Sequence, residues 1–401
     1  MTGASTLSPI QAYFAQGLRG RSTWQYWAFG LFFAGLIFAV LQIPSAVLFV
    51  VGLGMIGPEA LQGITASSET PDPSAIATGF AVFLVTLIAS IASIVLFFIG
   101  STRKPENKTL VTISAILALI ATATGIYLLG SGGGDEAANQ MIAIGIKQSA
   151  LIYAALLIGF PPMIIGLCAS VKWVHKRSIK SLMTAHTSFR WGRLFQTMIV
   201  FWAIAGALGI ITHLLGWSDY EYVFDPSRFF IYVIVSLLFI PLQSAAEEIL
   251  LRGYLNQGLG KYIKNPWIVF FITSAGFAAL HLGNPEAAKG AENGTLLLTM
   301  SGYFAFGFIA CILTYMDGGL ESAIGMHVAN NLFASTIMGY DDSVLPTPTV
   351  FNTTLDPSKD MIMLVLSMGL MLFILWKLRK PLVPDLPSLA DTMDDKSEVF
   401  S

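Results

Sequence analysis

The sequence predicts an all-α, polytopic membrane protein with about ten transmembrane helices. Of its 401 residues, 55% are hydrophobic and only 11% are charged, whereas soluble domains contain about 25% charged residues. The apolar residues lie in ten long runs. The basic residues are concentrated in every second loop between these runs. A net charge of -2 provides no field that would attract nucleic acid, so the lipid bilayer is the expected partner.

Ten segments are apolar over roughly the 20 residues that a helix needs to cross a bilayer. The first contains Pro44, where we expect the helix to bend because proline lacks a backbone N–H. Trp24, Trp217 and Trp376 lie near segment ends, as aromatic residues do at membrane interfaces. The predicted spans are Trp24–Gly54, Ala75–Gly100, Leu110–Gly130, Ser149–Val171, Leu194–Trp217, Phe229–Leu255, Pro266–Leu282, Thr295–Met316, Leu320–Met338 and Met361–Leu378.

The distribution of Lys and Arg predicts a multi-pass protein of the cell membrane (a bacterial-type inner membrane) with both termini cytoplasmic. Cytoplasmic loops carry the excess of Lys and Arg. With the N-terminus inside, four of the 22 basic residues fall outside, which leaves 22 minus four, or 18, inside. Omitting one span would scramble this alternation, so the span number and the direction support each other. The four outside residues are Lys147, Arg228, Lys289 and Lys359.

Composition divides the chain into four parts. They are a cytoplasmic N-terminal segment (1–23), N-terminal membrane helices with a basic cytoplasmic loop (24–193), a second membrane domain (194–380) and a flexible acidic cytoplasmic tail (381–401). No removable signal peptide is expected, because no basic segment leads directly into a short apolar run and a small-residue cleavage site. Cys168 and Cys311 lie in separate apolar runs, which favours buried thiols over a disulfide.

Two adjacent carboxylates interrupt the sixth apolar run. Glu247 and Glu248 are followed by Arg252, one helical turn after Glu248. A charge at the centre of a spanning helix costs about 2.5–3.5 kcal/mol even on the mild insertion scale, so these groups must face protein or trapped water. Glu248 and Arg252 are predicted to pair as i, i+4 neighbours. Glu247 points about 100° away around the helix, which leaves it free for another role.

Two later runs supply matching polar groups. The seventh contains His281, with Phe277 one turn before it, and the ninth contains His327 and Asn331 one turn apart. Each of these residues could instead have only a structural role, since intramembrane His and Asn side chains often form hydrogen bonds between helices. Taken together, a carboxylate, two imidazoles and an amide favour hydrolysis, which needs a base for water and donors for an oxyanion.

Three motifs resemble those of a known family. They are EEILLR (Glu247–Arg252), FAALH (Phe277–His281) and HVANN (His327–Asn331). They are similar to the EExxxR, FxxxH and HxxxN motifs of the CPBP (CAAX protease, or Abi) family of intramembrane endopeptidases. The resemblance covers about 229–338, where the motifs occur in the family's order, and it implies a catalytic core in the later helices.

The resemblance also implies a role for each motif residue. The implied catalytic residues are Glu247 and His281, which would activate a water molecule, and His327 and Asn331, which would stabilise the oxyanion. The implied supporting residues are Glu248, Arg252 and Phe277.

Metal dependence stays open at the level of sequence. The family's chemistry is described both as metal-dependent and as a metal-free glutamate mechanism, so the protein can be glutamate-type or metalloprotease-like. No cofactor is favoured, although Glu247, His281 and His327 could bind Zn²⁺ at an open three-ligand site. The chain contains no HExxH motif, so the usual zincin arrangement is absent.

The function that the resemblance implies is hydrolysis of a peptide bond in a membrane-associated protein or peptide. The alternative is a membrane transporter or a non-catalytic membrane scaffold, because buried Glu, His and Arg also mark ion paths. The sequence determines neither the substrate nor the oligomeric state. We expect a buried site at middle depth that opens toward the cytoplasm.

Overall fold

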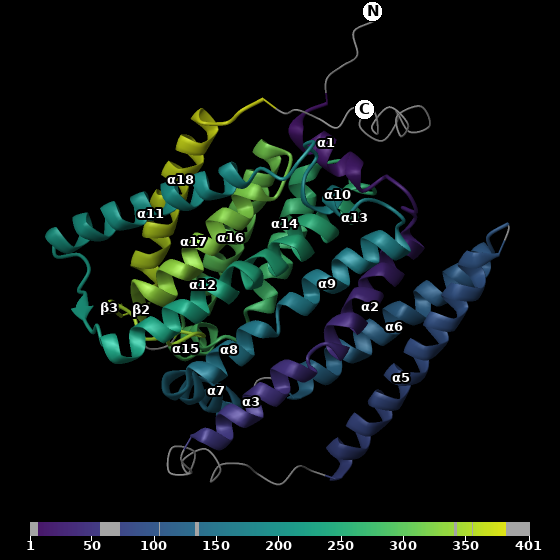
Figure 1. The fold of residues 1–401 in the computed structure, drawn as a ribbon, viewed down its shortest axis with the longest axis horizontal. Helices are drawn as coiled ribbons and strands as arrows, with labels where there is room; N and C mark the ends of the chain where they lie inside the picture. The colour runs from purple at the N-terminus through teal and green to yellow at the C-terminus, as the bar shows by residue number, and fades with distance from the viewer. Residues whose placement is uncertain are drawn as a thin grey trace, which may run out of the picture.

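A computed structural model describes residues 7–56, 73–103, 105–132, 136–340, 343–354 and 356–381 of the chain. Within these residues the protein is an assembly of long tilted helices with one small sheet (Figure 1). Eight helices are long and apolar enough to cross a membrane, and a bent pair is a ninth candidate. The predicted all-α polytopic membrane fold is confirmed, whereas the acidic tail from residue 382 lies outside the described residues.

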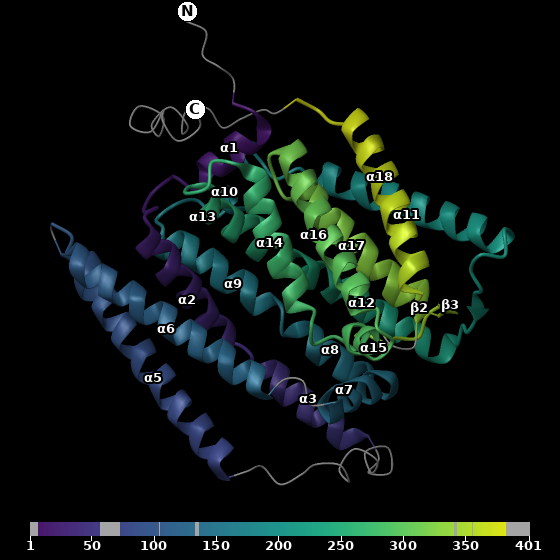
Figure 2. The ribbon, with the colours of Figure 1, turned by 180° about the vertical axis from the view of Figure 1, so that it is seen from behind.

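The first helices form a separate layer at one side of the assembly (Figures 1 and 2). α2 (Trp24–Val40) and α3 (Ile43–Met55) make one candidate span that is interrupted just before Pro44, where the bend was predicted. α5 (Pro73–Thr102) and α6 (Lys108–Gly132) pair with each other, and α6 packs along α2.

The middle of the chain links this layer to the later helices. α8, α9 and a π-helical turn, η1, follow one another as a single candidate span, Ala150–Val174. The elements are α7 (Glu136–Gln148), α8 (Ala150–Ile158), α9 (Pro161–Ala169), η1 (Ser170–Val174), α10 (Lys180–Met183) and α11 (Trp191–Leu214).

The later helices pack around α17. A continuous helix of 35 residues, Pro226–Gly260, contains a π-helical segment that begins directly after Glu248, and such segments are frequent at functional sites. The elements are α12 (Pro226–Glu248), η2 (Ile249–Leu255), α13 (Asn256–Gly260), α14 (Pro266–Leu280), α15 (Pro285–Glu292), α16 (Leu296–Asp317), α17 (Glu321–Thr336) and α18 (Pro357–Lys377).

Two of the ten predicted spans are shorter than a membrane crossing. α14 has 15 residues and turns by 86° into α15, and α17 has 16 residues. At 1.5 Å per residue they extend about 22 and 24 Å, less than the roughly 30 Å of a hydrocarbon core. The prediction of ten full spans is therefore too high. Residues Glu321–Ala329 of α17 are all buried, and hydropathy alone does not distinguish burial in protein from burial in lipid.

The two ends of the helical assembly differ in charge. We call the end that carries α1 (Pro9–Gln16), α10 and α13 the basic end, because the described Lys and Arg residues predicted to be inside, apart from Arg252, lie there. α18 also finishes at this end (Figure 2). Lys147, Arg228, Lys289 and Lys359 lie at the other end, beside α7 and α15, which we call the opposite end.

A three-stranded sheet covers part of the opposite end. The strands are β1 (Glu221–Tyr222), β2 (Met338–Tyr340) and β3 (Phe351–Thr353) in the order β1-β3-β2, with β1 antiparallel and β2 parallel to β3. β2 continues from α17, so the sheet fixes the segment that follows the third motif.

The proposed division of the chain at residue 193 stays a prediction. One hydrophobic core cluster contains Ala34 and Leu182 from before this position and Leu194 and Val328 from after it. Both cysteines are free, Cys311 being fully buried and Cys168 half-buried.

Candidate active site

Glu247 lies in the last turn of α12, where one of its oxygens is held and the other is left open. Gln243, one turn earlier, donates from Nε2 to Glu247 Oε1 at 2.5 Å. Glu247 Oε2 is buried and has no hydrogen-bond partner among the described residues, and it lies 3.8 Å from His327 Nε2. Buried polar atoms nearly always have a partner, so this oxygen is suited to a water molecule or a reacting group.

Glu248 points into the protein and binds two partners with one oxygen. Glu248 Oε1 accepts from Arg252 Nη1 at 3.1 Å and from His327 Nδ1 at 2.8 Å. Both charged side chains are completely buried. Arg252 also donates from Nη2 to Gly307 O at 2.8 Å and lies over the Phe277 ring at 4.8 Å. The predicted i, i+4 ion pair is present, and it ties η2 to α14, α16 and α17.

The two imidazoles have the same tautomer. His327 Nδ1 faces a carboxylate oxygen, and His281 Nδ1 lies 2.7 Å from the backbone oxygen of Phe277. An oxygen of either kind only accepts, so both Nδ1 atoms carry the proton and both Nε2 atoms hold a lone pair. In their neutral forms, the two rings can therefore accept a proton at Nε2 but cannot donate one there.

His281 is fixed at the point where α14 ends. Its ring lies between the Phe277 and Tyr303 rings, with both centroid distances 4.4 Å. Asn284 donates to the Tyr303 hydroxyl at 3.1 Å. His281 and Glu247 line the same cavity, although no hydrogen bond joins them among the described residues. The FxxxH spacing places the backbone oxygen of Phe277 beside the His281 ring, and this oxygen determines the tautomer of the ring.

Asn331 belongs to an amide chain that reaches Glu247. Asn331 Nδ2 donates to Gln243 Oε1 at 2.9 Å and to Ser244 Oγ at 3.4 Å, and Asn330 donates to Asn331 Oδ1 at 3.0 Å. Gln243 therefore connects the carboxylate to the amide of the third motif. Sequence reasoning missed Gln243, although its position one turn before Glu247 places both side chains on one helix face.

The four predicted catalytic residues line one cavity of about 670 Å³. Phe277 lines it too, whereas Glu248 and Arg252 lie behind it. A cavity of this size falls in the usual range for ligand sites, roughly 300–1,000 Å³. The remaining polar lining comes mainly from the opposite end: Asn284, Glu286, Lys289, Asn293, Thr295, Tyr340, Ser343 and Asp360. The cavity therefore extends toward the opposite end, and the expected opening toward the cytoplasm stays a prediction.

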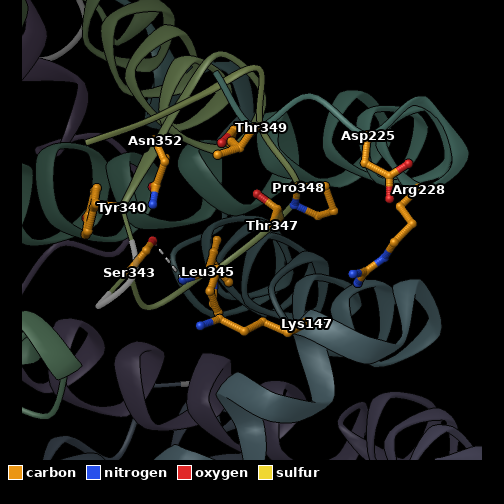
Figure 3. A pocket seen from close by; sticks show the side chains of 13 residues that line it. Lys147, Asp225, Arg228, Tyr340, Ser343, Leu345, Thr347, Pro348, Thr349 and Asn352 are labelled. Atoms are coloured by element: carbon orange, nitrogen blue, oxygen red, sulfur yellow. Dashed lines mark hydrogen bonds between the residues drawn. The ribbon is translucent and has the colours of Figure 1, made fainter. Parts of the chain in front are cut away.

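A second pocket of about 290 Å³ lies beside this cavity (Figure 3). It shares Tyr340, Ser343 and Leu345 with the larger cavity, and Lys147 and Arg228 also line it. It contains none of the predicted catalytic residues. The opposite end is therefore hollowed in two adjacent places.

The candidate zinc ligands do not form a three-ligand cluster. Within the described parts of the chain, no group of three or more His, Cys, Asp or Glu side chains could hold a metal ion. Glu247 lies 3.8 Å from His327 Nε2, whereas the contacts of the His281 ring are with the Phe277 and Tyr303 rings. This arrangement does not fit the three-ligand site, so we base the chemistry on the side chains alone.

The fold and the site together define a multi-pass helical membrane protein with a carboxylate and two imidazoles inside its later helices. Residues 226–333 match the model of the family described as Type II CAAX prenyl endopeptidase Rce1-like. The match spans all three motifs, so the resemblance noted from them is confirmed over this region.

Comparison with individual proteins extends the similarity beyond the motifs. The chain is 29% identical over 222 residues to "Uncharacterized protein YyaK" of Bacillus subtilis (strain 168), which covers 55% of this chain and 70% of that relative. No solved structure matches the chain significantly.

Proposed function

We propose that the protein is an intramembrane endopeptidase that hydrolyses a peptide bond of a membrane-associated protein or peptide. The observation that carries the proposal is the open oxygen of Glu247, 3.8 Å from His327 Nε2, in a cavity that His281 and Asn331 also line. The Rce1-like match supports the same class of reaction.

Glu247 and His281 are proposed to activate the attacking water. Glu247 Oε2 has no hydrogen-bond partner in the described chain, and His281 Nε2 holds a lone pair, so each can accept a hydrogen from water. Gln243 restrains the other carboxylate oxygen, which limits the directions in which Oε2 can point.

His327 and Asn331 are proposed to bind the oxyanion, and each must first change its hydrogen bonding. His327 can donate from Nε2 only when it is doubly protonated, and Glu248 accepts from its Nδ1. The Asn331 amide donates to Gln243 and Ser244, so one of these bonds is exchanged for the substrate. The proton that Glu247 takes from water can reach Nε2 of His327 across the 3.8 Å between them, and it passes from there to the leaving nitrogen when the C–N bond breaks.

The test compares Glu247→Gln with the wild type. General-base catalysis contributes about 10²- to 10⁴-fold, so Glu247→Gln should lower turnover of a quenched fluorescent peptide with an apolar C-terminal half by that factor. Purified full-length protein in detergent micelles is used.

Glu292→Gln is the matched control, because Glu292 is an exposed carboxylate of α15 that does not line the cavity. Its turnover should equal that of the wild type. Equal turnover of the wild type and Glu247→Gln refutes the proposal.

A further inference from the structure

The protein is solidly packed between the candidate active site and the basic end. Directly behind the site, Thr273 donates to Asn256 Oδ1 at 2.8 Å and Asn256 donates to Cys311 Sγ at 3.6 Å. These three side chains are at most 2% exposed. Together with the buried Glu248–Arg252 pair, they join η2, α13, α14 and α16.

A second buried layer lies closer to the basic end. Arg177, in the loop after η1, donates to Gln16 O at 2.9 Å and to Gln257 Oε1 at 2.8 Å. Tyr13 donates from its hydroxyl to Leu182 O at 2.7 Å. These side chains are buried, so α1 and the basic loop pack into the protein and close this end over α13 (Figure 2).

The cavity follows the other direction. Its lining continues from Glu247 through Thr299 in the first turn of α16 to Asn293, which is exposed at the end of α15. α15, the first turns of α16 and α18, and the end of β2 all contribute to this part, and Figure 1 shows them together at the opposite end. Among the described residues, the polar lining of the cavity therefore leads from Glu247 to the opposite end.

Charge identifies the side of the membrane on which this end lies. The basic end carries most of the described Lys and Arg residues, and the positive-inside rule assigns such an end to the cytoplasm. We infer that the cavity receives its substrate from the non-cytoplasmic face, and that the bond cleaved lies in an apolar, exported peptide segment close to that face. The inference rests on the proposed function for the cleavage step but not for the access route.

The walls of the cavity specify the kind of segment. One wall is apolar and comes from α8 and α9, with Leu156, Phe160 and Met163, and Leu280 of α14 also lines the cavity. The rim near the opposite end is polar and carries both signs of charge: Glu286, Lys289 and Asp360. An extended apolar peptide would bury its side chains against the walls, while its polar continuation would reach water past the rim.

The test measures labelling of single cysteines by a charged, membrane-impermeant maleimide in intact expression cells. The background carries Cys168→Ala and Cys311→Ser, which removes both native thiols. Three variants are compared: Asn293→Cys at the rim, Thr299→Cys inside the cavity, and Lys264→Cys, exposed between α13 and α14 at the basic end. We expect Asn293→Cys and Thr299→Cys to be labelled in intact cells, and Lys264→Cys only after permeabilisation.

Three results would overturn the inference. Labelling of Lys264→Cys in intact cells with Asn293→Cys protected would reverse the sidedness. Labelling of Asn293→Cys without Thr299→Cys would show that the cavity is closed to the outside, and protection of both would show the same. Each labelling experiment is repeated with Glu247→Gln, whose labelling should be unchanged, so a failure of peptidase activity is separable from a failure of access.

Discussion

The buried ion pair between Glu248 and Arg252 offers a quantitative test of what holds the candidate site together. Arg252→Met keeps an unbranched apolar stem but removes the guanidinium and its charge. The variant loses the 3.1 Å bond to Glu248 and the 2.8 Å bond to Gly307 O. Glu248 is left fully buried with His327 as its remaining partner.

The expected loss of unfolding free energy for Arg252→Met is about 3–5 kcal/mol, because removing one partner leaves an uncompensated buried charge. The double variant Glu248→Gln with Arg252→Met removes both charges, and neutral replacements of a buried pair often cost little. Since Gly307 O still lacks its donor, we expect the double variant to lose only about 1–3 kcal/mol, the usual penalty for one unsatisfied buried group.

Unfolding is followed by circular dichroism as SDS is added to protein in mixed micelles. Arg379→Met, at the exposed end of α18, is the control and should change stability by no more than about 0.5 kcal/mol. A loss below about 1 kcal/mol for Arg252→Met would refute the reasoning. A double variant whose loss equals the sum of the two single losses would refute it as well, because the two charges would then be energetically independent.

Three further predictions follow from individual contacts. Gly325→Ala should destabilise the protein by about 1–3 kcal/mol, because the new Cβ would lie 2.5 Å from a backbone oxygen of α11. Gly276→Ala is the control, because its Cβ would meet no other atom within 4 Å. Unfolding in SDS measures the stability of both variants. Gln243→Leu should lower peptide turnover while leaving the free energy of unfolding nearly unchanged, because it releases Glu247 Oε1. Turnover equal to that of the wild type would show that Gln243 does not position Glu247. Burial and a nearby guanidinium lower the pKa of His175 from 6.5 to about 3. The unfolded state therefore binds a proton that the folded state does not, and stability should fall by about 1.4 kcal/mol per pH unit below about pH 6.5; His175→Gln should flatten that slope.

Features that depend only on the local order of residues could be predicted without the structure. Apolar runs of sufficient length identified every membrane segment, and Pro44 marked the break between α2 and α3. The i, i+4 spacing of Glu248 and Arg252 was enough to predict their ion pair, because helix geometry brings such residues together whatever surrounds them. The three motifs identified residues that now share one cavity.

Tertiary packing decided which groups meet across helices. The sequence did not show that one oxygen of Glu248 binds both Arg252 and His327, nor that Gln243 links Glu247 to Asn331. These contacts depend on how far each helix is displaced along its neighbour, and hydrophobic periodicity carries no information about that displacement.

The same limit explains why the number of full spans and the direction of the cavity could not be predicted. α17 reads as a membrane span because it is apolar, yet its first residues are buried by neighbouring helices. The cavity opens toward the opposite end because α1 and the loop containing Arg177 fill the basic end. The apolar composition of these segments predicts that they are buried away from water. Only their packing against one another determines whether lipid, protein or an open cavity surrounds them.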